Sequence, residues 1–256
     1  MPGGRRANLH QPTASQVAET RAPGGPQQRP GETVAQKKGF RWKRTRQSHR
    51  GKQDPELREL KQADLELLVQ AAEEGNIDLK YLDESGFCLW SPVSYSYIRV
   101  GQQKVLEQTA RRGRRLSIVG LFEPGRSFDY ALAVGSFNGQ RYLKFMDSMA
   151  NQAEVTLSKT GRLTVVVQDN GSSHKSKAVQ QRWSEWEEKG LIVFFLPPYC
   201  SEMNLIESEW RQLKAYEISG RMFEHEYDLA MALIEGVEHR AQQAGFTPER
   251  FRFISA

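Results

Sequence analysis

The sequence predicts an α/β domain with a mixed β-sheet and flanking helices, preceded by a disordered tail and a short basic segment. Strand-like and helix-like segments alternate along the chain from residue 54 onward. The chain has 256 residues, of which 38% are hydrophobic and 26% charged, and this is enough for one ordinary core with extensions. The surplus of positive charge lies before the first of these segments. One folded domain is therefore expected after a cationic N-terminal region.

The net charge of +5 is unevenly distributed. Residues 1–36 carry four Arg and two Glu, residues 37–52 carry eight Lys or Arg and no acid, and residues 53–256 carry 24 bases and 29 acids. The first of these segments also holds five Gly and five Pro among mostly polar residues. Such a composition cannot bury enough apolar surface to offset the entropy of ordering, so residues 1–36 are expected to form a disordered tail.

The basic segment 37–52 interleaves Phe40 and Trp42 with its cations. This pattern suits contact with phosphates and partial stacking on bases. A solvated basic linker explains the composition equally well. The cations that are candidates for nucleic-acid binding are Lys37, Lys38, Arg41, Lys43, Arg44 and Arg46.

A connecting helix is expected within residues 53–76. Asp54 is a good N-cap residue, and it is followed by a proline at the first helical position and an acid in the first turn. Apolar residues then follow at helical spacing until Gly75 supplies a stop. The next expected elements form an antiparallel meander of strands, at about 79–90, 115–123 and 128–137.

The rest of the domain alternates helices with two apolar, buried strands. The expected elements are a helix from Gln140 to Gln152, a strand from Leu163 to Gln168, a helix from Lys175 to Lys189, a strand from Leu191 to Leu196, and helices from about Met203 to Glu217 and Glu226 to Ala244. Strands followed by such an alternation are typical of an α/β domain with a mixed sheet.

Neither a membrane span nor a disulfide framework is expected. The longest unbroken apolar run, Leu191 to Leu196, is far short of the roughly 20 residues that cross a bilayer. No apolar segment of the signal-peptide kind follows the first residues. Cys88 and Cys200 lack the paired spacing of a disulfide scaffold or a four-cysteine zinc site. A reducing, cytoplasmic compartment fits these features best.

Three carboxylates occupy positions where an α/β sheet tends to place its active site. Asp83 lies within the first expected strand, and strand alternation sends Glu84 to the opposite face. Asp169 directly follows a Val-rich buried strand. Glu207 lies one turn into its expected helix, beside an apolar face that includes Trp210. Each acid also has an ordinary interpretation: an edge position or cross-strand ion pair for Asp83, a turn for Asp169 and the Asn-Gly after it, and a solvated helix surface for Glu207.

Bringing three carboxylates together costs repulsion and desolvation unless cations neutralise them, and oxygen ligands favour Mg²⁺ or Mn²⁺ over zinc. Two such ions about 3.5–4 Å apart can activate a water or hydroxyl and stabilise the leaving oxygen in a phosphodiester displacement. Phosphoryl transfer on nucleic acid is the matching reaction class. His174 has two interpretations, as a cap for the helix expected near Lys175 or as a contact to the scissile phosphate.

The three acids lie in the strings YLDESGF (81–87), VVVQDNGSSHKS (165–176) and FLPPYCSEMNLIESEWRQLK (195–214). In this order the strings resemble the three catalytic blocks of bacterial insertion-sequence transposases in the mariner superfamily. The resemblance extends from about Gly39 to about Glu217. It covers some two thirds of the chain.

That resemblance implies a ribonuclease-H-like DDE catalytic domain over residues 77–220 and a C-terminal helical extension over residues 221–256. The chemistry it implies is hydrolysis at transposon ends followed by attack of the freed 3′-hydroxyl on target DNA, with two Mg²⁺ or Mn²⁺ ions and a homodimeric protein. The metal-binding DDE triad that it implies is Asp83, Asp169 and Glu207, and the supporting residues are Asn170, His174 and Asn204.

The chain departs from the family pattern in the loop before Glu207. Serine follows Cys200 and leucine follows Asn204 where the family usually has proline, so this loop is less restricted in φ. The interval from Asp169 to Glu207 is also a few residues longer than usual. Neither departure removes a ligand.

The N-terminus departs further, because family members carry a helix-turn-helix region there. Residues 37–52 resemble only its last basic stretch, and residues 1–36 show no helix pair. A truncated element is expected, or the downstream half of a transposase with a DNA-binding partner from an upstream frame, in the bacterial cytoplasm at the nucleoid. Two alternatives remain open: a non-catalytic remnant that binds DNA or inhibits an intact transposase, and a ribonuclease-H-like nuclease with another nucleic-acid substrate.

A second basic group lies between the first two expected strands. Four cations beside a metal site would guide DNA to an otherwise acidic domain, although a solvated loop is an equally simple interpretation. In the resembling family this region also contributes to dimer and DNA contacts, an expectation extended here to residues 91–114. The cations of the group are Arg111, Arg112, Arg114 and Arg115.

Overall fold

The structure is a computed structural model, and it describes residues 50–91, 102, 105, 115–245 and 248–253. The expected tail, nearly all of the basic segment 37–52 and most of the loop 91–114 lie outside the described residues. Within the part of the chain that is described, no helix is long and apolar enough to cross a membrane.

Helix α2 (Pro55–Glu73) begins where the sequence predicts. The Asp54 side chain accepts hydrogen bonds from the backbone N–H groups of Glu56 and Leu57, each at 3.1 Å. These bonds satisfy two of the donors that the first turn of a helix leaves free. Just beyond the helix, Gly75 adopts a φ of +77°, a left-handed conformation that favours glycine. The predicted helix and its two end signals are confirmed.

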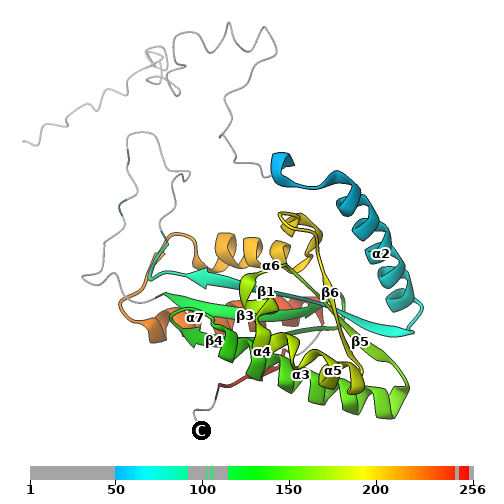
Figure 1. Cartoon of the computed structure of the whole chain (residues 1–256). Coiled ribbons are helices and arrows are strands. Elements are labelled where there is room, and N and C mark those ends of the chain that lie inside the picture. The colour runs from blue at the N-terminus through cyan, green and yellow to red at the C-terminus, as the bar shows by residue number, and fades with distance from the viewer. Residues whose placement is uncertain (1–49, 92–101, 103–104, 106–114, 246–247, 254–256) are drawn as a thin grey trace, which may run out of the picture. The chain divides into compact units, whose positions relative to one another are not determined.

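A six-stranded mixed sheet lies at the centre of the fold, in the order β6-β5-β1-β3-β4-β8 (Figure 1). β1, β3 and β4 form the predicted antiparallel meander, and β5 runs parallel to both β1 and β6. The strands of this sheet are β1 (Ile77–Phe87), β3 (Leu116–Glu123), β4 (Ser127–Val134), β5 (Leu163–Gln168), β6 (Leu191–Phe195) and β8 (Arg250–Phe251). A separate two-stranded ribbon joins β2 (Trp90–Ser91) and β7 (Arg221–Met222).

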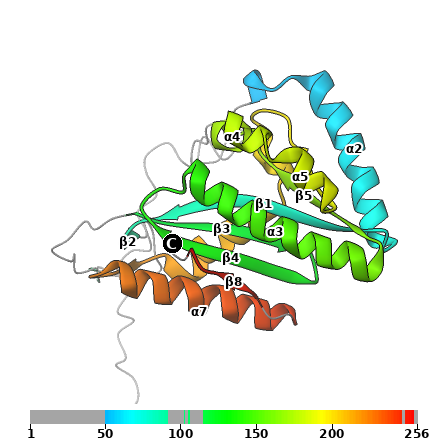
Figure 2. The ribbon, with the colours of Figure 1, turned by 60° about the horizontal axis from the view of Figure 1, so that its bottom comes forward.

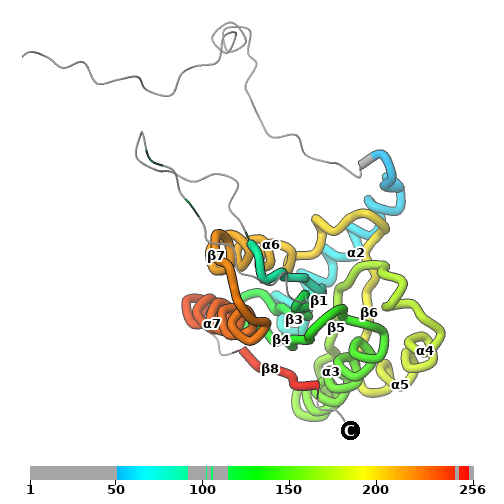
Figure 3. Tube along the Cα trace, turned by 90° about the vertical axis from the view of Figure 1, so that its left-hand side faces the viewer, coloured from blue at the N-terminus to red at the C-terminus, as the bar shows by residue number. Residues whose placement is uncertain are grey.

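Helices cover both faces of the sheet (Figures 2 and 3). One face buries a core with α2 and with α6 (Ile206–Gln212) and α7 (Glu226–Ala244). The other face buries a second core, mainly against α3 (Gly139–Thr160), with α4 (Lys177–Gln180) and α5 (Trp183–Glu188) beside it. Helix α3 extends past its predicted end at Gln152, and α7 matches its prediction. The predicted sheet with flanking helices is confirmed.

The single helix predicted over residues 175–189 is wrong. The chain there forms a 3₁₀ turn, η2 (Ser172–Lys175), followed by the two short helices α4 and α5. Ser176 caps α4 with its side-chain oxygen, and Arg182, between the two helices, donates through Nη2 to Asp147 on α3 at 2.9 Å. Local capping and this tertiary contact outweigh the helical pattern of the sequence.

The helix predicted from about residue 203 to 217 begins later than expected. Asn204 is extended, with φ −89° and ψ 108°, because its side-chain amide donates to the Leu82 backbone carbonyl at 2.9 Å. Glu207 is consequently the second residue of α6 rather than a residue one turn into the helix, which corrects the prediction. The segments that replace the predicted helix are η3 (Ser201–Met203), α6 and a π-helical turn, η4 (Leu213–Ile218).

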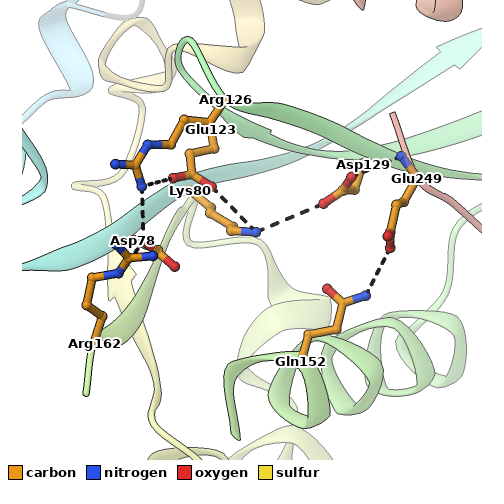
Figure 4. Close-up of polar contacts among 8 residues, drawn as sticks. All are labelled: Asp78, Lys80, Glu123, Arg126, Asp129, Gln152, Arg162 and Glu249. Carbon is orange, nitrogen blue, oxygen red and sulfur yellow. Dashed lines mark hydrogen bonds and ion pairs between the residues drawn. The ribbon is translucent and has the colours of Figure 1, made fainter. Parts of the chain in front are cut away.

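A network of neutralised charges lies around the start of β1 (Figure 4). Asp78, Glu123 and Asp129 are only 7–9% exposed, and burial raises the pKa of Asp129. Each of the three carboxylates lies within 4.0 Å of at least one cationic nitrogen. The cations are Lys80, Arg126 and Arg162. The fold therefore compensates buried negative charge at this end of the strand.

Candidate active site

Asp83 lies near the middle of β1 and contacts α6. Its Oδ2 accepts a hydrogen bond from the indole Nε1–H of Trp210 at 3.0 Å. Burial is the largest cause that raises the pKa of Asp83 to about 7. The negative charges of Glu207, Glu84 and Asp169 act in the same direction. Asp83 therefore lies in a partly buried environment with a surplus of negative charge.

Asp169 directly follows β5, the strand that pairs with β1 up to Tyr81 and Val167. Its negative charge contributes to the raised pKa of Asp83. Asp169 Oδ1 also accepts the backbone N–H of Gly171 at 2.9 Å. The turn that the sequence indicates therefore forms. It orients the Asp169 carboxylate, so the turn and a role of Asp169 as a metal ligand are compatible.

His174 bridges Glu84 on β1 and Asp169, which follows β5. The residue is 2% exposed, its Nδ1 lies 2.9 Å from Asp169 Oδ1, and its Nε2 lies 3.0 Å from Glu84 Oε1. Burial alone disfavours the imidazolium, but the two carboxylates outweigh burial and raise the pKa of His174 to about 10. In return, His174 holds the pKa of Asp169 below its ordinary value.

The predicted role of His174 as a helix cap is wrong, because Ser176 caps the helix that follows. Both ring nitrogens of His174 lie close to carboxylates, so the side chain acts as a buried cation that partly compensates Glu84 and Asp169. A contact of His174 with the scissile phosphate stays a prediction.

The two supporting asparagines form hydrogen bonds that hold the elements carrying the acids against neighbouring segments. The Asn204 amide binds the Leu82 carbonyl, so the entry to α6, where Glu207 lies, is held against β1. The Asn170 amide donates to the Leu196 carbonyl, which ties the turn after β5 to the exit of β6. In the described part of the chain, the buried Oδ1 atoms of both asparagines have no hydrogen-bond partner.

The three acids of this site lack the Lys and Arg partners that neutralise the carboxylates at the start of β1, in the part of the chain that the structure describes. Among the residues that the structure describes, no Lys or Arg forms an ion pair with Asp83, Asp169 or Glu207, and the only cation in contact is His174. Within the described residues, the repulsion at Asp83 is therefore left without a compensating Lys or Arg. Oxygen ligands with surplus negative charge suit Mg²⁺ or Mn²⁺.

Within the described ranges, no group of three or more His, Cys, Asp or Glu side chains is arranged to hold a metal ion. The fit to a hard divalent cation therefore rests on the oxygen donors of the three carboxylates and on the uncompensated charge at Asp83.

Glu84 and Trp210 are parts of the site that sequence analysis missed. Strand alternation correctly directs Glu84 away from Asp83, but no local pattern connects Glu84 with His174, 90 residues further on. The sequence pattern assigns Trp210 only to an apolar helix face. Its spacing of three residues from Glu207, which places both on one side of a helix, is the signal that could have found it.

Arg115 is the only described residue among the predicted nucleic-acid-binding cations. Its guanidinium lies against Gly86, where an added Cβ would meet Nε at 1.9 Å, so it lies beside β1 two residues beyond Glu84. The other nine cations predicted to bind nucleic acid lie outside the described residues, and their role stays a prediction.

A comparison with protein families identifies the domain. Residues 78–230 match the family described as DDE superfamily endonuclease. The match covers more than half of the chain and includes β1, β5 and α6. The chain belongs to the DDE superfamily endonuclease family. No curated protein sequence matches it significantly.

Solved structures of Mos1 transposase share the fold. The Mos1 mariner paired-end complex with Mn has a TM-score of 0.59 at 16% identity, covering 83% of this chain and 63% of that chain. The Mos1 strand transfer complex has a TM-score of 0.56 at 16% identity, with coverages of 80% and 60%. The paired-end complex with the left transposon end has a TM-score of 0.54 at 14% identity, with coverages of 83% and 67%. The chain thus spans 60–67% of these transposase chains, and the predicted ribonuclease-H-like fold is confirmed.

Proposed function

We propose that the chain is a DNA transposase catalytic domain of the bacterial insertion-sequence type. It hydrolyses phosphodiester bonds at transposon ends, and the freed 3′-hydroxyl then attacks a phosphodiester of target DNA, which joins the two strands and releases a 3′-hydroxyl on the target. One observation carries the proposal: Asp83, Asp169 and Glu207 come from three separate elements of a DDE superfamily endonuclease domain, and no Lys or Arg among the described residues pairs with them. The transposon-end and strand-transfer complexes of the similar Mos1 structures support the substrate class.

Asp83, Asp169 and Glu207 would hold one or two Mg²⁺ or Mn²⁺ ions, the ions named in the similar Mos1 complexes. Such ions, when bound, activate an attacking oxygen and stabilise a leaving oxygen. The chain's own residues prepare the ligands. His174 orients Asp169 and offsets part of the negative charge, and Asn204 holds the start of α6 against β1.

The proposal extends to the way in which DNA and a second subunit are bound. Arg115 and the cations at 37–52 and 111–114 would contact DNA phosphates and so guide DNA toward acidic residues. A homodimer would let two subunits act on two transposon ends. An upstream-frame protein remains a candidate partner for end recognition.

A nicking assay with labelled duplex DNA tests the proposal. Wild-type protein is expected to nick DNA only with Mg²⁺ or Mn²⁺, and Asp169→Ala is expected to lose this activity. Glu154→Gln, which removes an exposed carboxylate from α3, serves as the matched control and should nick like wild type. Equal activity of Asp169→Ala and wild type would reject the assignment of the triad.

The same assay distinguishes the substrates. Transposon-end duplexes, branched DNA and RNA–DNA hybrids are compared with wild type and Asp169→Ala. We expect triad-dependent cleavage and strand joining with DNA ends. Triad-dependent cleavage of the hybrid alone would assign the chain to ribonuclease-H-like nucleases instead.

A further inference from the structure

We propose that Trp210 is a positioning residue for Asp83: its indole N–H holds the carboxylate in the orientation in which it binds metal. The inference rests on the proposed function, because it takes Asp83 to be a metal ligand. The role of Trp210 is additional, because Trp210 was used neither in predicting the three acids from the motifs nor in the argument from the charge balance.

The hydrogen bond from Trp210 is suited to orienting a metal ligand. Trp210 Nε1 lies 3.0 Å from Asp83 Oδ2, and Trp210 is 2% exposed, so water does not compete for the donor. An indole is a neutral donor that cannot ionise in the accessible pH range. It can therefore fix the carboxylate without cancelling the charge that attracts a cation, which a Lys or Arg in the same place would do.

The space for the indole comes from a glycine opposite Asp83. Gly120 on β3 pairs with Asp83 across the two strands. A Cβ at Gly120 would lie 2.6 Å from Trp210 Cη2 and 2.8 Å from Cζ2, both too close for a real contact. The absence of a side chain at this one position lets the ring lie over the strand and reach the neighbouring carboxylate.

The ring is also held from other directions. Phe128 on β4 meets it edge-on, with ring centroids 5.6 Å apart and planes at 88°, a favourable geometry for aromatic pairs. Because packing fixes the ring, the direction of its N–H is fixed as well. Trp210 and Glu207 lie three residues apart on α6, so the same helical turn carries one proposed ligand and orients another.

The chain contains a matched control. Trp186 on α5 is 1% exposed, and its Nε1 donates to Asp147 Oδ1 at 2.8 Å. This is the same kind of indole–carboxylate bond, but its acceptor Asp147 lies on α3, pairs with Arg182 and is not one of the three acids. Trp186→Phe therefore measures the structural cost of losing such a bond without removing a hydrogen bond to a proposed metal ligand.

The experiment measures Mn²⁺ affinity of the full chain by titration calorimetry or by the electron paramagnetic resonance of free Mn²⁺. Wild type, Trp210→Phe, Trp186→Phe and Asp83→Ala are compared, and urea unfolding of each variant reports folding. We expect Trp210→Phe to weaken Mn²⁺ binding about 10- to 100-fold, the effect typical of losing a partner of a metal ligand. Trp186→Phe should bind Mn²⁺ like wild type although its stability falls comparably.

Each outcome is decisive. Unchanged Mn²⁺ affinity in Trp210→Phe, with affinity lost in Asp83→Ala, would overturn the role of Trp210 and leave the proposed function intact. Equal Mn²⁺ binding by wild type and Asp83→Ala would instead overturn the proposed function. If Trp210→Phe does not fold, benzothienylalanine at position 210 keeps the shape of indole and lacks only the N–H. Its affinity must then fall in the same way, and wild-type affinity would refute the proposal.

Discussion

Asp83→Asn is expected to make the metal-free protein more stable, although most substitutions of partly buried residues destabilise. The amide keeps an oxygen that can accept the Trp210 hydrogen bond and has nearly the same volume as the carboxylate. What it removes is a charge that the fold does not compensate, next to Glu207, Glu84 and Asp169. A functional carboxylate held at the expense of stability is a common feature of active sites.

The magnitude follows from the pKa of Asp83. Burial and neighbouring charge raise it from 3.8 to about 7, which corresponds to at most roughly 4 kcal/mol at a pH above both values. Because Asp83 is partly exposed, solvent screening lowers this limit, and we expect about 1–3 kcal/mol. Folding raises the pKa of Asp83. The contribution of Asp83 to the free energy of unfolding is therefore fully present below pH 3.8 and is lost as the pH rises through about 7.

Urea unfolding in the presence of EDTA measures this effect. The free energy of unfolding of Asp83→Asn should exceed that of wild type, and the difference should grow between about pH 5 and pH 8 because asparagine does not titrate. Asp78→Asn, in the compensated network of the same strand, loses ion pairs with Arg126 and Arg162 and should destabilise at both pH values. If wild type is more stable than Asp83→Asn at the higher pH, the charge at this site is compensated and the reasoning is wrong.

Four further predictions concern metal binding, packing, the histidine bridge and DNA. Mg²⁺ or Mn²⁺ at about 100 times its dissociation constant should stabilise wild type by about 2.7 kcal/mol in a thermal-unfolding scan, and a similar gain in Asp169→Ala would contradict the site. Gly120→Ala should lower the free energy of unfolding by about 1–3 kcal/mol, since its Cβ meets Trp210 at 2.6 Å; an unchanged urea midpoint would show that the ring gives way freely. His174→Ala leaves two carboxylates without their shared partner and should cost about 1–3 kcal/mol at neutral pH, measured by urea unfolding, where wild-type stability would disprove the bridge. Deleting residues 37–52 should reduce the log–log salt slope of DNA binding by about 0.9 for each phosphate that the segment neutralises, and an equal slope would make the segment a linker.

Those elements whose signals are local could be predicted from the sequence. Strand β5 and helix α7 have the boundaries that their apolar patterns indicate, and α2 begins at its Asp-Pro signal. The six-stranded sheet needed only one further strand, β8, whose two residues carry no periodicity.

Features that depend on distant contacts could not be predicted. The break between α4 and α5 involves Arg182 and Asp147, 35 residues apart, and the late start of α6 involves Asn204 and the Leu82 carbonyl, 122 residues apart. In the candidate site, the motifs predict the three acids. They do not predict the Trp210 hydrogen bond, because it also needs a glycine on a third element.

The proposed function depends most on Asp83, Asp169 and Glu207 sharing divalent metal. Anomalous diffraction at the manganese edge from crystals grown with Mn²⁺ tests this most directly. We expect one or two anomalous peaks among the three carboxylates, with oxygen ligands, and the disappearance of these peaks in Asp169→Ala. Mn²⁺ bound elsewhere, with the three carboxylates directed apart, would contradict the metal site.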